Sequence, residues 1–190
     1  MKKATLFLLL GIATLFAGEV YSDQVKALYA DSTSTKVIGK LLPTNALTIK
    51  QKVDGRVQIT LRGYRNPAVP NVIYFNETTR ILVAAFAKNA TFEVKEITPA
   101  KEGGFPFVEV SVYTDDGGFS ENVGSLFSKA ADIYKEGCGI CHALHETTHY
   151  KANQWPGLLK SMLSRTAINK EDEMLVVQYL QKHSADVKVK

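Results

Sequence analysis

The chain has 190 residues, of which 45% are hydrophobic and 22% are charged, and its formal net charge at pH 7 is +4. This is the composition of an ordinary globular protein with room for one large domain or two small ones. The positive charge is modest and not clustered, so nothing in it points to a nucleic-acid partner.

The first 17 residues have the pattern of a secretory signal peptide. Lys2 and Lys3 form a short basic region, and an apolar run follows from position 4 to position 17. The run is well short of the roughly 20 residues that span a bilayer, so no stable membrane insertion is predicted. We expect cleavage after Ala17, or alternatively after Ser22, and therefore a periplasmic protein. A buried N-terminal helix is the other interpretation of this run.

Residues 23–119 are predicted to form strands. The clearest signal covers residues 46–62, where hydrophobic and polar residues alternate on both sides of Asp54-Gly55. That dipeptide favours a two-residue hairpin, because both turn positions need positive φ. Further strands are predicted over 81–87, 92–98 and 107–114.

This segment resembles bacterial SH3-like domains. The matching letters are Ala-Leu-Tyr-Ala (27–30), Val-Ile-Gly-Lys-Leu (37–41), the hairpin, and Gly-Tyr (63–64). The tryptophan that this family usually carries after the hairpin turn is missing here. The segment holds no His, no Cys and no convergent acidic pair, so we expect it to dock or position a partner, or to act as a passive cap on the second half.

The second half holds the only two cysteines of the chain, in the motif Cys138-Gly139-Ile140-Cys141-His142. C-x-x-C-H is the attachment signal for c-type haem. One helical turn places both thiols where they can form thioether bonds to the porphyrin, and His142 then follows as the proximal iron ligand. We therefore predict one covalent haem c. A zinc site would need a second ligand pair, and a thioredoxin-type dithiol would not need the histidine; these two and a disulfide remain as alternatives.

Three helices are predicted around this motif. The first is expected to begin with Ser125 as its N-cap and to end at Gly137. The second is expected to run from Asn153 to about Arg165. The third is expected to begin at Asn169 and to carry an apolar face. Such an arrangement resembles small monohaem cytochromes c.

Met162 is the predicted distal iron ligand. It follows Trp155 by two helical turns on the same face. Trp155 is expected to pack on the haem. The pattern C-x-x-C-H, W-x6-M, Y-L resembles a recurrent class of cytochrome c domains in which that methionine binds iron. His149 is the alternative ligand, and simple core packing is the alternative role for Met162. His145 is expected to be exposed or bonded to a propionate.

The order of these parts resembles the C-terminal part of the pentahaem cytochromes that serve trimethylamine N-oxide reductases. The resemblance lies in the SH3-like segment, Cys-Gly-Ile-Cys-His-Ala (138–143), His-Tyr-Lys-Ala-Asn-Gln-Trp-Pro-Gly-Leu-Leu-Lys-Ser-Met (149–162) and Val-Gln-Tyr-Leu-Gln-Lys-His-Ser-Ala-Asp (177–186). It implies an α+β chain of two domains, an N-terminal SH3-like β-barrel-type domain (23–119) followed by a small all-α cytochrome c domain (120–190).

The same resemblance implies an electron-transfer protein and not an enzyme. Its partner would be a periplasmic molybdopterin reductase of N- or S-oxides. Members of that family carry a membrane-anchored four-haem domain first, whereas these 190 residues hold one haem motif. We therefore expect an upstream membrane quinol-oxidising cytochrome to supply the electrons.

Two other functions stay open from the sequence. If Met162 only packs, the chain is a haem-based sensor or small-ligand-binding protein with an open sixth position. If no haem binds, the chain is an SH3-like adhesion module with a disulfide.

Overall fold

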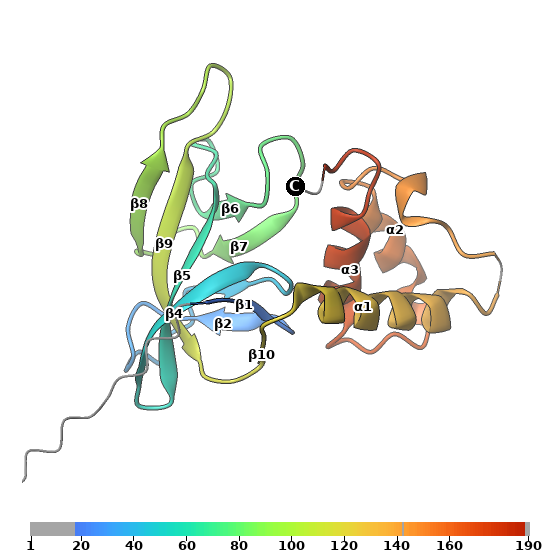
Figure 1. The fold of residues 1–190 in the computed structure, drawn as a ribbon, viewed down its shortest axis with the longest axis horizontal. Coiled ribbons are helices and arrows are strands. Elements are labelled where there is room, and N and C mark those ends of the chain that lie inside the picture. The colour runs from blue at the N-terminus through green and yellow to red at the C-terminus, as the bar shows by residue number, and fades with distance from the viewer. Residues whose placement is uncertain (1–17, 142, 189–190) are drawn as a thin grey trace, which may run out of the picture.

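Alternating hydrophobic and polar residues build the first part of the chain into a curled sheet, and three helices lie beside it (Figure 1). The structure, a computed structural model, describes residues 18–141 and 143–188. The predicted signal peptide (1–17) and the predicted proximal ligand His142 lie outside the described residues. The described chain is α+β, as predicted.

The sheet has ten strands. They are β1 (Glu19–Ser22), β2 (Lys26–Leu28), β3 (Gly39–Leu41), β4 (Ala46–Val53), β5 (Arg56–Tyr64), β6 (Val72–Tyr74), β7 (Leu82–Phe86), β8 (Glu93–Thr98), β9 (Phe107–Asp115) and β10 (Phe119–Ser120). The predicted strands over 81–87, 92–98 and 107–114 are confirmed as β7, β8 and β9. Strands β2 and β3 fall where the SH3-like resemblance implied two short strands, at 27–30 and 37–41. Strands β1, β6 and β10 were not predicted, because two to four residues are too few to show alternation.

The predicted hairpin is confirmed as β4 and β5. Asp54 and Gly55 have φ values of 49° and 81°, as a turn with two positive φ angles requires. Ile49 lies opposite Ile59 in the antiparallel register, and both side chains are buried. The pattern that predicted the hairpin is therefore the pattern that fills the core.

Strand β5 pairs with three other strands, β4, β6 and β9, and lies at the centre of the curled sheet. The strand order is β10-β1-β4-β5-β6-β7-β3-β2, and β9 pairs with both β5 and β8. An antiparallel bridge between Tyr29 and Tyr113 then brings the end of β2 to β9. The inward side chains of this curled sheet form the larger hydrophobic core of the chain.

The first helix, α1 (Val123–Cys138), begins earlier than predicted. Asn122 is its N-cap, and its side-chain oxygen accepts a hydrogen bond of 2.8 Å from the Gly124 N–H. Ser125 is not the cap; it lies inside the first turn, where its hydroxyl donates to the Asn122 carbonyl at 2.7 Å. Both side chains suit a cap, and the one nearer the last strand takes the position.

The same helix continues past Gly137, its predicted end. It closes at Cys138, with Gly139 as the C-cap. A Cβ at Gly137 would lie 2.6 Å from Cγ1 of Ile168, so the glycine allows the segment after α2 to pack closely on the helix. The first cysteine of the haem motif is therefore helical.

The other two helices are shorter than predicted. Helix α2 (Trp155–Met162) starts two residues after Asn153 and is followed by the 3-10 turn η2 (Leu163–Arg165). The side chain of Asn153 does not cap α2 but accepts a 2.6 Å hydrogen bond from the Arg80 N–H of the sheet part. Helix α3 (Glu173–Lys182) begins four residues after the predicted Asn169.

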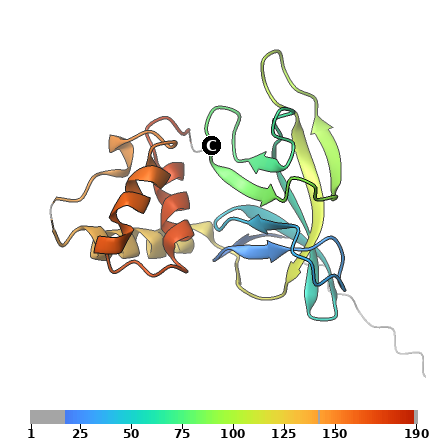
Figure 2. The same cartoon turned by 180° about the vertical axis from the view of Figure 1, so that it is seen from behind.

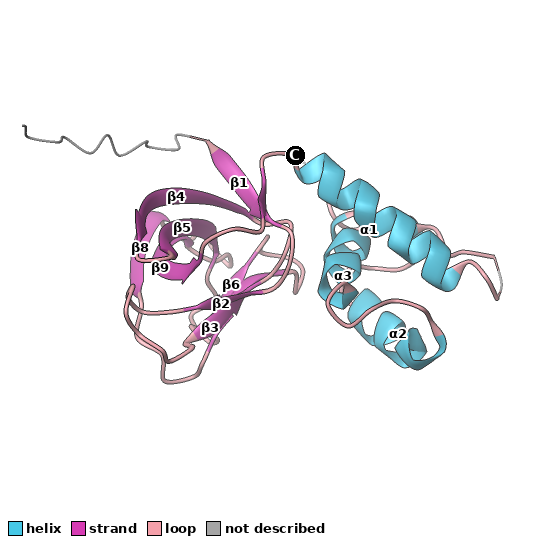
Figure 3. Ribbon diagram, turned by 90° about the horizontal axis from the view of Figure 1, so that it is seen from below, coloured by secondary structure: helices cyan, strands magenta, loops and turns pink. Residues whose placement is uncertain are grey.

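Helix α3 lies between α1 and α2 and packs on both (Figure 3). Tyr134, Trp155, Leu159, Val176 and Leu180 form the centre of the helical core. The helices and the sheet lie side by side when viewed from either side (Figures 1 and 2). None of the described helices has the length and hydropathy that a membrane crossing requires.

Candidate haem site

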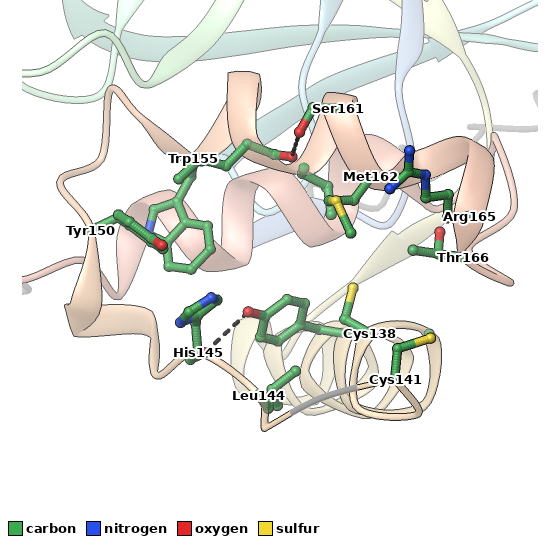
Figure 4. Close-up of a pocket in the computed structure, with 14 residues that line it drawn as sticks. Cys138, Cys141, Leu144, His145, Tyr150, Trp155, Ser161, Met162, Arg165 and Thr166 are labelled. Atoms are coloured by element: carbon green, nitrogen blue, oxygen red, sulfur yellow. Dashed lines mark hydrogen bonds between the residues drawn. The ribbon is translucent and has the colours of Figure 1, made fainter.

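A pocket of about 440 Å³ opens between the end of α1, the loop that follows it, and α2 (Figure 4). Its lining is mostly apolar and aromatic. The lining residues are Tyr134, Gly137, Cys138, Cys141, Leu144, His145, Tyr150, Trp155, Leu158, Leu159, Ser161, Met162, Arg165 and Thr166. The pocket therefore brings together four of the site residues predicted from the sequence: Cys138, Cys141, Trp155 and Met162.

The two cysteines lie at one end of this pocket. Cys138 is the last residue of α1 and is half-buried, whereas Cys141 follows in the next turn and is exposed; both are free thiols. Burial raises the pKa of the Cys138 thiol, so this sulfur is a protonated thiol at neutral pH. Two thiols on one short segment, both facing an apolar pocket, are placed to attach one flat ligand along one of its edges.

The opposite wall of the pocket is α2, which carries Trp155 at its first position and Met162 at its last. Trp155 is only 3% exposed, and its indole N–H donates a 3.1 Å hydrogen bond to the Thr147 carbonyl. Met162 is 37% exposed, and its side chain extends from α2 toward the end of the pocket where Cys138 and Cys141 lie (Figure 4). A soft thioether sulfur is thus held on the wall opposite the cysteine segment.

Of the two other histidines near the motif, only one lines the pocket. His145 is half-buried and lines the pocket, whereas His149 lies in the 3-10 turn η1 (Thr147–His149), is exposed and does not belong to the lining. Their rings are nevertheless close, with centroids 4.9 Å apart. His145, Tyr150 and Trp155 occupy the end of the pocket away from the cysteines (Figure 4).

Aromatic side chains that the sequence analysis did not single out fix this end. The Tyr134 hydroxyl donates a 3.0 Å hydrogen bond to the His145 carbonyl, and burial raises the pKa of Tyr134 to about 12. The rings of Tyr134 and Tyr150 both meet Trp155 edge-on, with centroids 6.1 Å and 5.1 Å away. The sequence does contain one indication of the role of Tyr134: it precedes Cys138 by one helical turn and so lies on the same face of the helix.

The residues present fit a haem c. The pocket volume falls in the roughly 300–1,000 Å³ range of cofactor sites, and its walls are mostly apolar, with a few polar groups at each end. Two thiols are available for covalent attachment and one thioether faces them. Cys138 and Cys141 are the residues that would hold the group, with Trp155 packed beside it.

A family model described as the TorC third cytochrome c domain matches residues 16–119 of the chain. The chain is 25% identical over 172 residues to the cytochrome c-type protein TorC of Escherichia coli strain K12, a match that covers 88% of this chain and 44% of that protein. It is 27% identical over 153 residues to the cytochrome c-type protein TorY of Haemophilus influenzae, covering 78% of this chain and 41% of that protein.

The chain thus spans less than half the length of these curated relatives. No solved structure matches it. The family model covers the sheet, and the match to TorC, at 88% of the chain, necessarily extends beyond the sheet into the helices. Because the family model matches more than half of the residues, the chain belongs to the family of the TorC third cytochrome c domain, a cytochrome c family whose cofactor is haem c.

Proposed function

We propose that this chain is a periplasmic c-type cytochrome that carries one covalent haem and transfers electrons without turning over a substrate. The observation that carries the proposal is the pocket shared by Cys138, Cys141, Trp155 and Met162. The C-x-x-C-H spacing and the resemblance to cytochrome c domains predicted these four residues, and all four line one cavity of suitable size.

Each residue has a role that follows from its place. Cys138 and Cys141 would form thioether bonds by adding their S–H groups to the two vinyl groups of the porphyrin. His142 and Met162 would be the proximal and distal iron ligands, and Trp155 would pack against the ring. When bound, the haem supplies one-electron chemistry, and the axial ligands with the apolar walls set its reduction potential. A methionine as the second ligand favours a stable electron carrier over a site open to small ligands.

We also propose that the chain consists of two domains, with an SH3-like domain over 23–119 and a cytochrome c domain over 120–190. The change from strand to helix lies within three residues of this boundary, since β10 (Phe119–Ser120) spans it and α1 begins at Val123. The sheet domain would fix the orientation of the haem domain toward its partner.

The proposed acceptor is a periplasmic molybdopterin reductase of N- or S-oxides, and the proposed donor is a membrane quinol-oxidising cytochrome. Support comes from the similarity to TorC and TorY and from the resemblance to cytochromes that serve trimethylamine N-oxide reductases.

Rapid mixing tests this partner directly. The dithionite-reduced cytochrome, freed of excess reductant, is mixed with an oxidised trimethylamine N-oxide reductase plus substrate, and haem oxidation is followed by absorbance. We expect oxidation that depends on both the reductase and the oxide. Haem that binds normally but stays reduced would exclude this acceptor while leaving the cytochrome assignment intact.

A further inference from the structure

Lys182, the last residue of α3, crosses from the helices into the sheet part. Its side chain is almost fully buried, with the residue 3% exposed. The Lys182 Nζ donates hydrogen bonds to the Thr44 carbonyl at 2.9 Å, the Thr44 hydroxyl at 3.0 Å and the Asn45 Oδ1 at 2.9 Å. It also lies 4.6 Å above the ring of Phe75. All of these partners are neutral.

The loop that contains Thr44 and Asn45 holds both residues in the orientation that this contact needs. The Asn45 amide nitrogen donates to the carbonyls of Leu42 and Leu82, at 3.0 and 3.2 Å, and this fixes its oxygen toward Lys182. Thr44 has a φ of 62°, which is rare for a β-branched residue and costs conformational energy. The surrounding structure therefore holds a strained residue in place so that two of its oxygens face the amine.

These partners satisfy a neutral amine as well as an ammonium. A neutral amine has two N–H groups for the Thr44 carbonyl and the Asn45 oxygen, and one lone pair that can accept from the Thr44 hydroxyl. The charged form, in contrast, is buried without a carboxylate among the groups that contact it. Burial accordingly lowers the pKa of Lys182 from its ordinary 10.5 to about 7.

No charged side chain is among the groups described in contact with the Lys182 amine. On the helix side, His183 meets the ring of Phe127 with centroids 4.7 Å apart, and Asp186 accepts from the Ala152 N–H at 2.8 Å. On the sheet side, Glu19 and Arg62 line a cavity that Asn45 and Phe75 also line, and Arg62 forms an ion pair of 2.8 Å with Glu109.

We propose that the Lys182 contact is a proton-sensitive joint between the sheet and the helices, closed when the amine is neutral and loosened when the amine takes up a proton. The closed joint binds the proton less tightly than an open, hydrated lysine does, so protons favour the open form. Loosening affects the haem pocket, because α3 also carries Val176 and Leu180, which pack in the same core as Trp155.

Hydrogen exchange of the Arg80 amide reports on this joint, because that amide donates across it to Asn153 at 2.6 Å. The measurement uses the full-length, haem-loaded protein, with rates corrected for the pH dependence of intrinsic exchange. If one proton is taken up when the joint opens, the equilibrium constant for opening should rise about tenfold for each unit by which the pH falls. From pH 9.5 to 7.5 the rise should be about 100-fold. The rise should level off below about pH 7.

Two variants distinguish the contribution of Lys182 to this pH dependence from general effects of pH on the protein. Lys182→Met keeps an apolar chain of similar length without a proton, so the Arg80 opening constant should become independent of pH. Lys170→Met removes an exposed lysine next to α3 and should leave the pH dependence unchanged. If Lys182→Met keeps the wild-type pH dependence, the joint does not respond to this amine.

A titration of the unaltered protein needs no variant. The Nζ resonance of Lys182, followed by heteronuclear NMR, should show loss of the proton near neutral pH. A Lys182 that stays cationic up to pH 10 in the folded protein would overturn the proposal, as would Arg80 exchange that is independent of pH in the wild type.

Discussion

The hydroxyl of Tyr134 donates a hydrogen bond to the backbone carbonyl of His145, 3.0 Å away. Tyr134 belongs to α1 and precedes the two cysteines, whereas His145 follows them, so this bond ties together the two ends of the segment that carries the haem motif. The same tyrosine ring meets Trp155 on the opposite wall. One side chain thus links the motif, the loop after it and α2.

Replacing Tyr134 by phenylalanine should weaken this arrangement. The variant keeps the ring but leaves the His145 carbonyl without this donor, so we expect the free energy of unfolding to fall by about 1 kcal/mol. Denaturant unfolding measures the change. Tyr179→Phe is the matched control, because the Tyr179 hydroxyl has no hydrogen-bond partner among the described residues. Equal losses in both variants would contradict the role of the bond.

Tyr134 also predicts how stability depends on alkaline pH. Burial raises its pKa in the folded protein to about 12, whereas in the unfolded chain it stays near 10. The unfolded state therefore loses this proton first, and stability should fall as pH rises from about 10 toward 12. Tyr134→Phe should show a smaller decline than the wild type between pH 9 and 11.5. Parallel curves for the two proteins would show that this tyrosine does not titrate as its burial requires.

Met162 and Met174 form a natural pair for testing the distal ligand. Met162 lines the pocket, whereas Met174 packs in the helical core from α3. We expect Met162→Ala to abolish the sulfur-to-iron absorption band at the red end of the ferric spectrum and to lower the reduction potential, because a thioether ligand favours ferrous iron. Met174→Ala should retain both. A band missing from the wild type would favour His149 as ligand, or a haem open to small ligands.

The sequence predicted the parts of the structure that local rules determine. Asp54-Gly55 fixed the hairpin because few residues accept two positive φ angles. The helical spacing of Trp155 and Met162 placed both on one wall of the pocket. Helix starts were less predictable, because several side chains could cap each one: Asn122 took the position expected for Ser125, and Asn153 bonded to Arg80 instead.

Contacts between distant segments could not be read from the sequence. Lys182 lies between Gln181 and His183 in the sequence and looks like an ordinary basic residue in the last turn of a helix. Only the fold shows that Thr44 and Asn45 receive it. Likewise, no periodicity distinguishes the pocket-lining His145 from the exposed His149, since the loop after the motif is irregular.

A fragment that begins at residue 120 tests the proposed domain boundary. The isolated helices should still bind haem, because every described lining residue of the pocket comes from residues 134–166. They should unfold at lower denaturant concentration than the whole chain, because Ala152 and Val187 lose their buried contact with Ile81. The unfolding midpoint, followed by haem absorbance, measures the difference. A fragment as stable as the whole chain would show that the sheet contributes nothing to the helices.

The intact mass of the mature protein under denaturing conditions tests the central claim most directly. Thioether-bound haem survives denaturation, so the account predicts a mass higher than that of the polypeptide by one haem. The double variant Cys138→Ala/Cys141→Ala should have the mass of the polypeptide alone. A wild-type protein that is exported and folded but carries no covalent haem would contradict the account.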